Sequence, residues 1–257
     1  MVLTTTPASS LPSPIPVPQF FMRPASPADA ATLCAIYAPY VRHTAITFEY
    51  TVPSVAEFAL RMQHTLERFP YILIAKVEPN AQSDNLCSRA EENTLPQVCT
   101  VAPGPASFTP LSVAKLVAAR PQDNEEIVGY CYASPFHVRE AYRHAVEMSI
   151  YLKEDARQQG LGRLLYQQME YLLKLQGILN LNACVAFDAT NGHDPYLTNA
   201  SVTFHQKMGY TLCAHFHRCG YKFARWYDMV WLEKILAHPT NCPPFIPWPE
   251  LQAQAQA

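Results

Sequence analysis

The chain has 257 residues, of which 49% are hydrophobic and 16% charged, and its formal net charge at pH 7 is −2. This charge gives no electrostatic support for binding nucleic acid or an anionic membrane, and no run approaches the roughly 18 apolar residues of a membrane span. Eight scattered cysteines without CxxC pairs favour free thiols in a reducing compartment. We therefore expect a cytoplasmic protein with no metal, nucleic-acid or membrane partner.

The first part of the chain predicts a tail, a strand and two helices before a core strand. Residues 1–18 are rich in Pro, Ser and Thr and carry no charge, which is typical of a disordered tail. A short strand follows over 20–25. Helices are then expected to begin at Ser26 and Ser54, because both serines stand at typical N-cap positions. The apolar run over 70–75 predicts a core strand.

Residues 77–124 interrupt this pattern. Asn, Ser, Pro, Glu and Gln dominate the segment, and no hydrophobic period lasts. Because the segment is longer than most connections inside compact domains, it is interpreted as a low-complexity insertion, largely disordered, with a short helix near 111–119. The sheet is expected to resume over 126–133.

The central stretch predicts a strand, a glycine-bearing turn and a helix. Apolar and polar side chains alternate over 146–152, which is the period of a half-buried strand. The turn 157–162 follows, and 163–175 carries apolar residues at helical spacing. A strand that leads through glycines into a helix start forms an anion site, because the N–H groups there are unpaired and the helix dipole is positive. Neither a Walker A loop nor a GxGxxG fingerprint is present.

The remaining elements complete one domain. We expect strands over 179–187, 210–217 and 227–236, a helix over 199–208, and a loop over 220–226. Residues 238–257 are rich in Pro, then in Ala and Gln, which predicts a loose tail. The element order predicts a mixed sheet flanked by helices, in a single domain over 19–237.

Several motifs, in the same order along the chain, carry a resemblance to a known family. The turn Arg157-x-x-Gly160-x-Gly162 resembles the acyl-CoA pyrophosphate loop of the GCN5-related N-acetyltransferase (GNAT) superfamily. Further blocks resemble its phosphinothricin and methionine sulfoximine N-acetyltransferase branch. These are Arg139-x-Ala-Tyr142-Arg143, Val146-Glu147-x-Ser-Ile-Tyr151-Leu152, Ser201-x-x-x-His205 and Gly220-Tyr-Lys222-Phe-x-Arg225-Trp-Tyr-Asp228. The resemblance spans 20–236 apart from the insertion, and implies the α/β GNAT fold, a central mixed sheet flanked by helices.

The resemblance also implies a function. It indicates an acetyl-CoA-dependent N-acetyltransferase that acts on the amine of a small amino-acid-like acceptor by direct attack in a ternary complex. Acetyl-CoA would be the co-substrate, without a metal, and family members that pair suggest a homodimer. Two alternatives stay open: a protein or peptide N-acetyltransferase, and a catalytically silent acyl-CoA-binding regulatory module.

Two residues are the candidates for proton transfer. The family places its proposed general base at the position of Glu147, and an amine that is protonated near neutral pH needs such a base. The alternative is a structural carboxylate paired with Arg139 or Arg143. His205 matches the family histidine and would assist proton transfer; its alternative is a packing or hydrogen-bonding role.

The cofactor candidates follow from the same blocks. Strand backbone would pair with the pantetheine arm, and the turn would hold the pyrophosphate. Arg157 has the alternative of a solvated surface arginine, and Ser201 that of a helix N-cap. The family reads Asp-x-x-Asn-x-x-Ser without a gap, whereas residues 192–198 separate two asparagines here, so either asparagine is a candidate. The set is Ile150, Tyr151, Leu152, Arg157, Gln158, Gln159, Gly160, Leu161, Gly162, Asn191, Asn199 and Ser201.

The acceptor site is expected to recognise a carboxylate as well as an amine, and arginine matches a carboxylate in bidentate fashion. Lys222 and Arg225 have the alternative of being fold signature only. The acceptor candidates are Phe48, Glu49, Arg139, Tyr142, Arg143, Val146 and Lys222.

Overall fold

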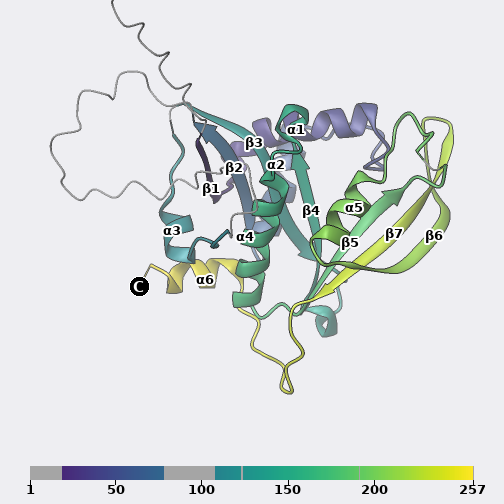
Figure 1. The fold of residues 1–257 in the computed structure, drawn as a ribbon. Coiled ribbons are helices and arrows are strands. Elements are labelled where there is room, and N and C mark those ends of the chain that lie inside the picture. The colour runs from purple at the N-terminus through teal and green to yellow at the C-terminus, as the bar shows by residue number, and fades with distance from the viewer. Residues whose placement is uncertain (1–18, 78–107, 123, 191, 257) are drawn as a thin grey trace, which may run out of the picture.

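The computed structural model describes residues 19–77, 108–122, 124–190 and 192–256, and its centre is a seven-stranded mixed sheet (Figure 1). The strand order is β1-β2-β3-β4-β5-β7-β6. The strands are β1 Gln19–Pro24, β2 Tyr71–Val77, β3 Glu125–Pro135, β4 Ala145–Leu152, β5 Asn180–Phe187, β6 Thr211–Lys222 and β7 Arg225–Ile235. The helices are α1 Ala30–His43, α2 Val55–Leu66, α3 Val113–Ala118, α4 Leu161–Leu175, α5 Ala200–Lys207 and α6 Trp248–Gln254.

The helices cover both faces of the sheet. Helices α1 and α2 bury their apolar residues against one face, and α3, α4, α5 and α6 lie on the other (Figure 1). The alternation in β4 fits this layering, since Val146 and Met148 lie in the core under α4 while Glu147 is half-buried on the α1 side. The predicted mixed sheet flanked by helices is confirmed.

The sheet opens between β4 and β5. All other neighbouring strands are antiparallel and pair along most of their length. β4 and β5 run parallel and pair only from Ala145 to Glu147, opposite Asn180 to Asn182. Beyond Glu147 the two strands separate, which leaves main-chain groups of β4 without a strand neighbour.

The C-terminal segment corrects a prediction. Residues 238–257 were expected to form a loose tail, but α6 packs on the sheet face that carries α4. Its Trp248 is 1% exposed and lies in the core, and the Trp248 N–H donates to the carbonyl of Arg68. The side-chain amide of Gln176 donates to the carbonyl of Ile246, which fixes the approach to the helix. The reason is local: one large apolar anchor outweighs a polar, proline-rich composition.

Two other segments refine the prediction. The expected helix of the insertion is present as α3, and its Leu116 is fully buried. The rest of the insertion, and the tail over 1–18, lie outside the described residues. The loop expected over 220–226 is shorter, because β6 and β7 join through Phe223 and Ala224, whose φ angles of 50° and 58° form a tight turn. Among the described residues, the helices are too short or too polar to cross a membrane.

Candidate active site

The gap between β4 and β5 exposes main-chain groups of β4. The N–H of Lys153 donates to Val128 on β3, whereas the Val146 carbonyl accepts from the side chain of Asn182 on β5. Since alternate residues of a strand direct their peptide groups to opposite sides, Met148 and Ile150 direct theirs toward the gap. The chain therefore presents peptide groups there that no strand pairs.

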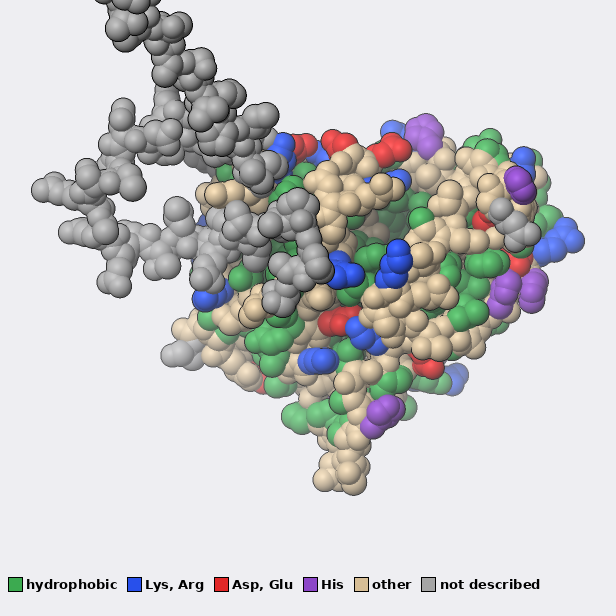
Figure 2. All heavy atoms as spheres, viewed as in Figure 1, with side chains coloured by type: hydrophobic (Ala, Val, Ile, Leu, Met, Phe, Trp, Pro, Cys, Tyr) green, Lys and Arg blue, Asp and Glu red, His purple; other side chains and the backbone are tan. Residues whose placement is uncertain are grey.

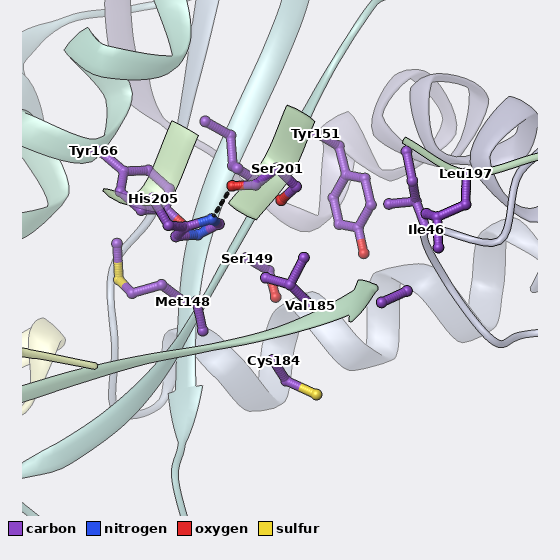
Figure 3. Close-up of a pocket in the computed structure, with 13 residues that line it drawn as sticks. Ile46, Met148, Ser149, Tyr151, Tyr166, Cys184, Val185, Leu197, Ser201 and His205 are labelled. Atoms are coloured by element: carbon purple, nitrogen blue, oxygen red, sulfur yellow. Dashed lines mark hydrogen bonds between the residues drawn. The ribbon is translucent and has the colours of Figure 1, made fainter. Parts of the chain in front are cut away.

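A cavity runs through this gap and is lined from both faces of the sheet (Figure 3). β4 contributes residues Met148 to Tyr151, and β5 contributes Ala183 to Ala186. We call it the first cavity. Figure 2 shows the α4 face hollowed between α4 and α5, over β4. The remaining lining residues are Ile46, Tyr166, Leu197, Ser201 and His205.

Glu147 is not itself a lining residue of the first cavity or of a second one, but its strand neighbours Met148 and Ser149 line the first, and its carboxylate lies near residues of both. It acts electrostatically on Cys184, which lines the first cavity, and on Tyr132, which lines the second. The second cavity lies between the sheet and helices α1 and α2. It is lined by Tyr37, Glu49, Phe58, Arg61, Met62, Thr65, Tyr71, Tyr130, Tyr132 and Tyr151.

Glu147 has no hydrogen-bond or ion-pair partner within the described residues. Arg143 pairs with Glu140 instead, at 3.1 Å, and Arg139 is exposed. The alternative of a structural carboxylate paired with either arginine is therefore not found. Burial raises the pKa of Glu147 above its usual value, which makes the carboxylate a stronger base than one in water.

The turn before α4 has the geometry of an anion site. Gln158 and Gly160 both adopt positive φ, 61° and 81°, and the N–H groups that start α4 have no partner within the helix. Arg157 lies over the ring of Tyr40 at 5.0 Å from the ring centroid. The Tyr40 hydroxyl in turn donates to the Leu152 carbonyl at 2.6 Å and accepts from the Leu152 N–H at 3.1 Å. One side chain of α1 thus holds both the end of β4 and the turn.

Gly162 packs α4 against the gap. A Cβ at this position would meet the ring of Phe204 at 3.4 Å and the side chains of Ile150 and Leu152 at 3.6 Å. A larger residue would therefore push the helix start away from β4. The spacing of the two glycines serves two purposes: Gly160 allows the turn, and Gly162 allows the close approach.

Comparisons with known proteins agree with this geometry. An acetyltransferase (GNAT) domain model matches residues 119–231. The chain carries an acetyltransferase domain of the GNAT family. This confirms the expected family and enzyme class, N-acetyltransferase.

The relatives and solved structures below resemble between about half and nine-tenths of the chain. It is 27% identical to a phosphinothricin N-acetyltransferase of Streptomyces coelicolor over 84% of this chain and 95% of that protein. It is 29% identical to an L-methionine sulfoximine/L-methionine sulfone acetyltransferase of Pseudomonas aeruginosa over 46% and 63%. A phosphinothricin acetyltransferase of Sinorhizobium meliloti, solved with acetyl-CoA, shares the fold with a TM-score of 0.61, 24% identity and coverage of 91% and 98%.

His205 of the GNAT domain is a buried, neutral histidine. Its Nδ1 donates to the Ser201 carbonyl at 2.7 Å, so its Nε2 accepts from the Tyr166 hydroxyl at 2.8 Å (Figure 3). Burial lowers the pKa of His205 to about 4. With both ring nitrogens occupied, the placement supports the hydrogen-bonding alternative, and His205 orients the Tyr166 hydroxyl beside the first cavity.

The depressed pKa of His205 predicts a loss of stability in mild acid. The unfolded chain takes up the proton near pH 6.5 and the folded protein only near pH 4, so stability falls as pH falls through that range. Denaturant unfolding of the wild type should give a free energy about 2 kcal/mol smaller at pH 5 than at pH 7. His205→Gln should flatten this dependence, whereas the exposed His64→Gln should keep it; equal slopes in all three proteins would contradict the prediction.

The remaining cofactor candidates differ in burial and in whether their side chains already hold hydrogen bonds. Leu161 is buried at the start of α4, and the side chain of Gln159 donates to the Asp155 carbonyl. Asn199 uses both ends of its amide on the main chain of Asp188, at 2.9 and 3.0 Å. The amide of Asn199 is therefore occupied by the chain itself, because the residues before α5 fold back onto the end of β5, and Asn199 remains one of two candidates. Asn191 lies outside the described residues.

Lys222 is a structural cation and not an acceptor ligand. It is 2% exposed, and its Nζ donates to the carbonyls of Thr44 and Thr47 at 2.8 and 2.7 Å. Burial lowers its pKa. This corrects the expectation that Lys222 binds the acceptor: the ammonium holds the loop between α1 and α2, which carries Phe48 and Glu49.

The other acceptor candidates are divided between the cavity, the core and the surface. Glu49 lines the second cavity and pairs with Arg61 at 2.6 Å. Val146 is fully buried in the core, so its side chain cannot contact an acceptor, which corrects that expectation. Phe48 packs on Gly220 and Tyr227 and lines neither cavity. The surface candidates are Arg139, Tyr142 and Arg143.

Removing the Lys222 ammonium should destabilise the fold. Lys222→Met leaves two buried carbonyls unpaired, and we expect the free energy of unfolding to fall by about 2–3 kcal/mol. Thermal or urea unfolding measures this change. The matched control is the exposed Lys174→Met, which should change it by less than about 0.5 kcal/mol; similar values for both variants would contradict the structural role.

Apart from Tyr151, the sequence did not single out the tyrosines that line the site. Tyr130, Tyr132 and Tyr151 lie on neighbouring strands of one sheet face, and Tyr71 stacks on Tyr132 with ring centroids 4.9 Å apart. Tyrosines at alternate positions of predicted strands are the available signal. Only the register between the strands shows that they gather at one cavity.

Proposed function

We propose that the chain transfers the acetyl group of acetyl-CoA to the amine of a small amino-acid-like molecule, by direct attack within a ternary complex. The observation that carries the proposal is the half-buried carboxylate of Glu147, which has no partner among the described residues and acts on residues that line two cavities. Relatives that are phosphinothricin and methionine sulfoximine acetyltransferases support the acceptor class.

The residues around the first cavity fit acetyl-CoA. The start of α4, with Gly160 and Arg157, offers N–H groups and a positive charge to a diphosphate. Lys and Arg side chains gather on the face that carries α4 (Figure 2). The peptide groups of Met148 and Ile150 suit the amides of a pantetheine arm, which would pair with them as a strand does. Acetyl-CoA supplies an activated acyl group as a thioester.

Glu147 would accept the proton from the acceptor ammonium, so that the neutral nitrogen forms the new bond to the acetyl carbon. The carbon–sulfur bond then breaks and its electron pair leaves with the sulfur as a thiolate, while the nitrogen loses a second proton to become the amide and that proton converts the thiolate to the thiol of coenzyme A. A covalent route through the cavity cysteine is disfavoured, because burial raises the pKa of Cys184 to about 12 and keeps the thiol protonated.

The second cavity would receive the acceptor. Its wall of tyrosines, with the Glu49–Arg61 pair at the rim, offers hydroxyl groups and both signs of charge. The exposed Arg139 and Arg143 are the candidates to meet a carboxylate. We place the enzyme in the cytoplasm, since the six cysteines that the structure describes are all free, and a homodimer is the arrangement we propose.

A thiol-release assay tests the proposal. Purified enzyme receives acetyl-CoA with phosphinothricin, L-methionine sulfoximine, free amino acids or short peptides. We expect turnover with an amino-acid-like amine, and initial-rate lines that intersect when both substrates are varied, as a ternary complex requires.

Other results would overturn the proposal in distinct ways. Turnover with peptides alone would favour a protein acceptor, and acetyl-CoA binding without any turnover would favour a silent module. Parallel initial-rate lines would indicate a covalent acetyl-enzyme and exclude direct attack.

A further inference from the structure

A cluster of two histidines and one carboxylate lies on the outer strand pair, away from both cavities. His215 and His217 stand two residues apart on β6, and their rings lie side by side although the pairing of β6 with β7 shifts register after Phe216. Asp228 lies on the neighbouring strand β7. One ligand atom from each of the three residues falls within 4.8 Å of the other two.

The geometry within the cluster suits a metal ion. His215 Nε2 lies 2.8 Å from Asp228 Oδ2, and the two imidazole rings stack with centroids 4.2 Å apart. A tetrahedral zinc site with bonds near 2.0–2.1 Å needs ligand atoms roughly 3.3 Å apart. Rotation of the exposed His217 ring can close the remaining distance without moving either strand.

The surroundings hold the carboxylate in place for such a role. The Arg218 N–H donates to Asp228 Oδ1 at 2.8 Å, which leaves Oδ2 directed at His215. Ligands oriented by a second hydrogen bond are typical of protein metal sites. Although burial alone would raise it, the pKa of Asp228 is lowered, because the Arg218 amide and His215 stabilise the anion.

The positive charge of Arg218 does not fill the site between the two histidines and Asp228. The Arg218 guanidinium lies over the ring of Trp226, 5.5 Å from its centroid. Phe187 closes one side of His215, with ring centroids 5.0 Å apart. Two imidazoles and a carboxylate are ligands that zinc accepts, with water in the remaining position.

We propose that His215, His217 and Asp228 bind a divalent transition-metal ion, with Zn²⁺ as the best match, and so tie β6 to β7. The site would correct the expectation that the chain holds no metal. It is independent of acetyl transfer, because none of its three residues lines either cavity.

The test uses full-length protein without an affinity tag, dialysed against a chelator and then titrated with ZnCl₂ in a calorimeter. We expect about one Zn²⁺ per chain and, at 100-fold excess over Kd, a rise in Tm of roughly 5–10 °C. Co²⁺ should give the visible absorption of a bound ion. The probe variant is His217→Ala, whose exposed side chain stacks on His215 and acts electrostatically on Asp228.

The matched control is His64→Ala, an exposed histidine on α2. Loss of Zn²⁺ binding and of the Tm rise in His217→Ala, with both kept in His64→Ala, would support the site. Equal binding by the two variants, or no stoichiometric binding by the wild type, would overturn it. Circular dichroism shows whether His217→Ala is folded; if it is not, His217→Gln, which keeps a polar side chain, replaces it in the same comparison.

Discussion

Replacing Glu147 by Gln is expected to lower kcat for acetyl transfer by about 10²–10⁴-fold, the usual contribution of a positioned general base. The amide keeps the size of the side chain but cannot accept the ammonium proton. Because no partner among the described residues depends on this carboxylate, the variant should fold, and its affinity for acetyl-CoA should stay close to that of the wild type. Steady-state kinetics and calorimetry measure the two effects separately.

The pH dependence of the rate distinguishes a base from a structural residue. In the wild type kcat should rise with pH as Glu147 deprotonates, at a pH above that of an ordinary glutamate because burial raises its pKa. This limb should be absent in Glu147→Gln. The control is the exposed Glu67→Gln on the surface beside α2, which should retain both the rate and the limb. A Glu147→Gln enzyme with wild-type kcat would remove Glu147 from the mechanism.

Truncation of Trp248 should be the most destabilising single change outside the site. Trp248→Ala removes a large side chain that is 1% exposed and packed in the core under α4. Cavity-forming truncations of this size cost about 3–5 kcal/mol. Urea unfolding should therefore show a lower midpoint, and α6 should become sensitive to proteases.

Trp226 provides the matched comparison, since it is 54% exposed on β7. Trp226→Ala loses the contact with Arg218 and should cost no more than about 1 kcal/mol. If the two tryptophan variants unfolded at the same urea concentration, the C-terminal segment would not be part of the folded core.

The central strand, turn and helix could be predicted because local patterns determine them. The alternation of apolar and polar residues over 146–152 predicted β4, and the glycines of the turn predicted where α4 begins. Glu147 was proposed from its position in a motif, and the structure shows that its carboxylate has no partner among the described residues. These features depend on neighbours in the chain, which a sequence displays directly.

Contacts between distant residues could not be predicted. The partners of the Lys222 ammonium lie 175 and 178 residues earlier in the chain, so the sequence showed a cation but not its buried carbonyls. The burial of Trp248 was missed because the residues around it are polar. Composition describes the average of a segment, whereas burial can depend on one large apolar side chain. Nothing in the local pattern distinguishes Tyr40, yet it contacts both Leu152 and Arg157.

The contact between Tyr40 and Leu152 also limits how much of β4 remains available. β5 covers the strand up to Glu147, and the Tyr40 hydroxyl satisfies Leu152. Only a short stretch around Met148 and Ile150 keeps unpaired peptide groups. An exposed edge of that length is too short to nucleate sheet growth with another molecule, so the protein can offer hydrogen bonds to a ligand without becoming prone to aggregation.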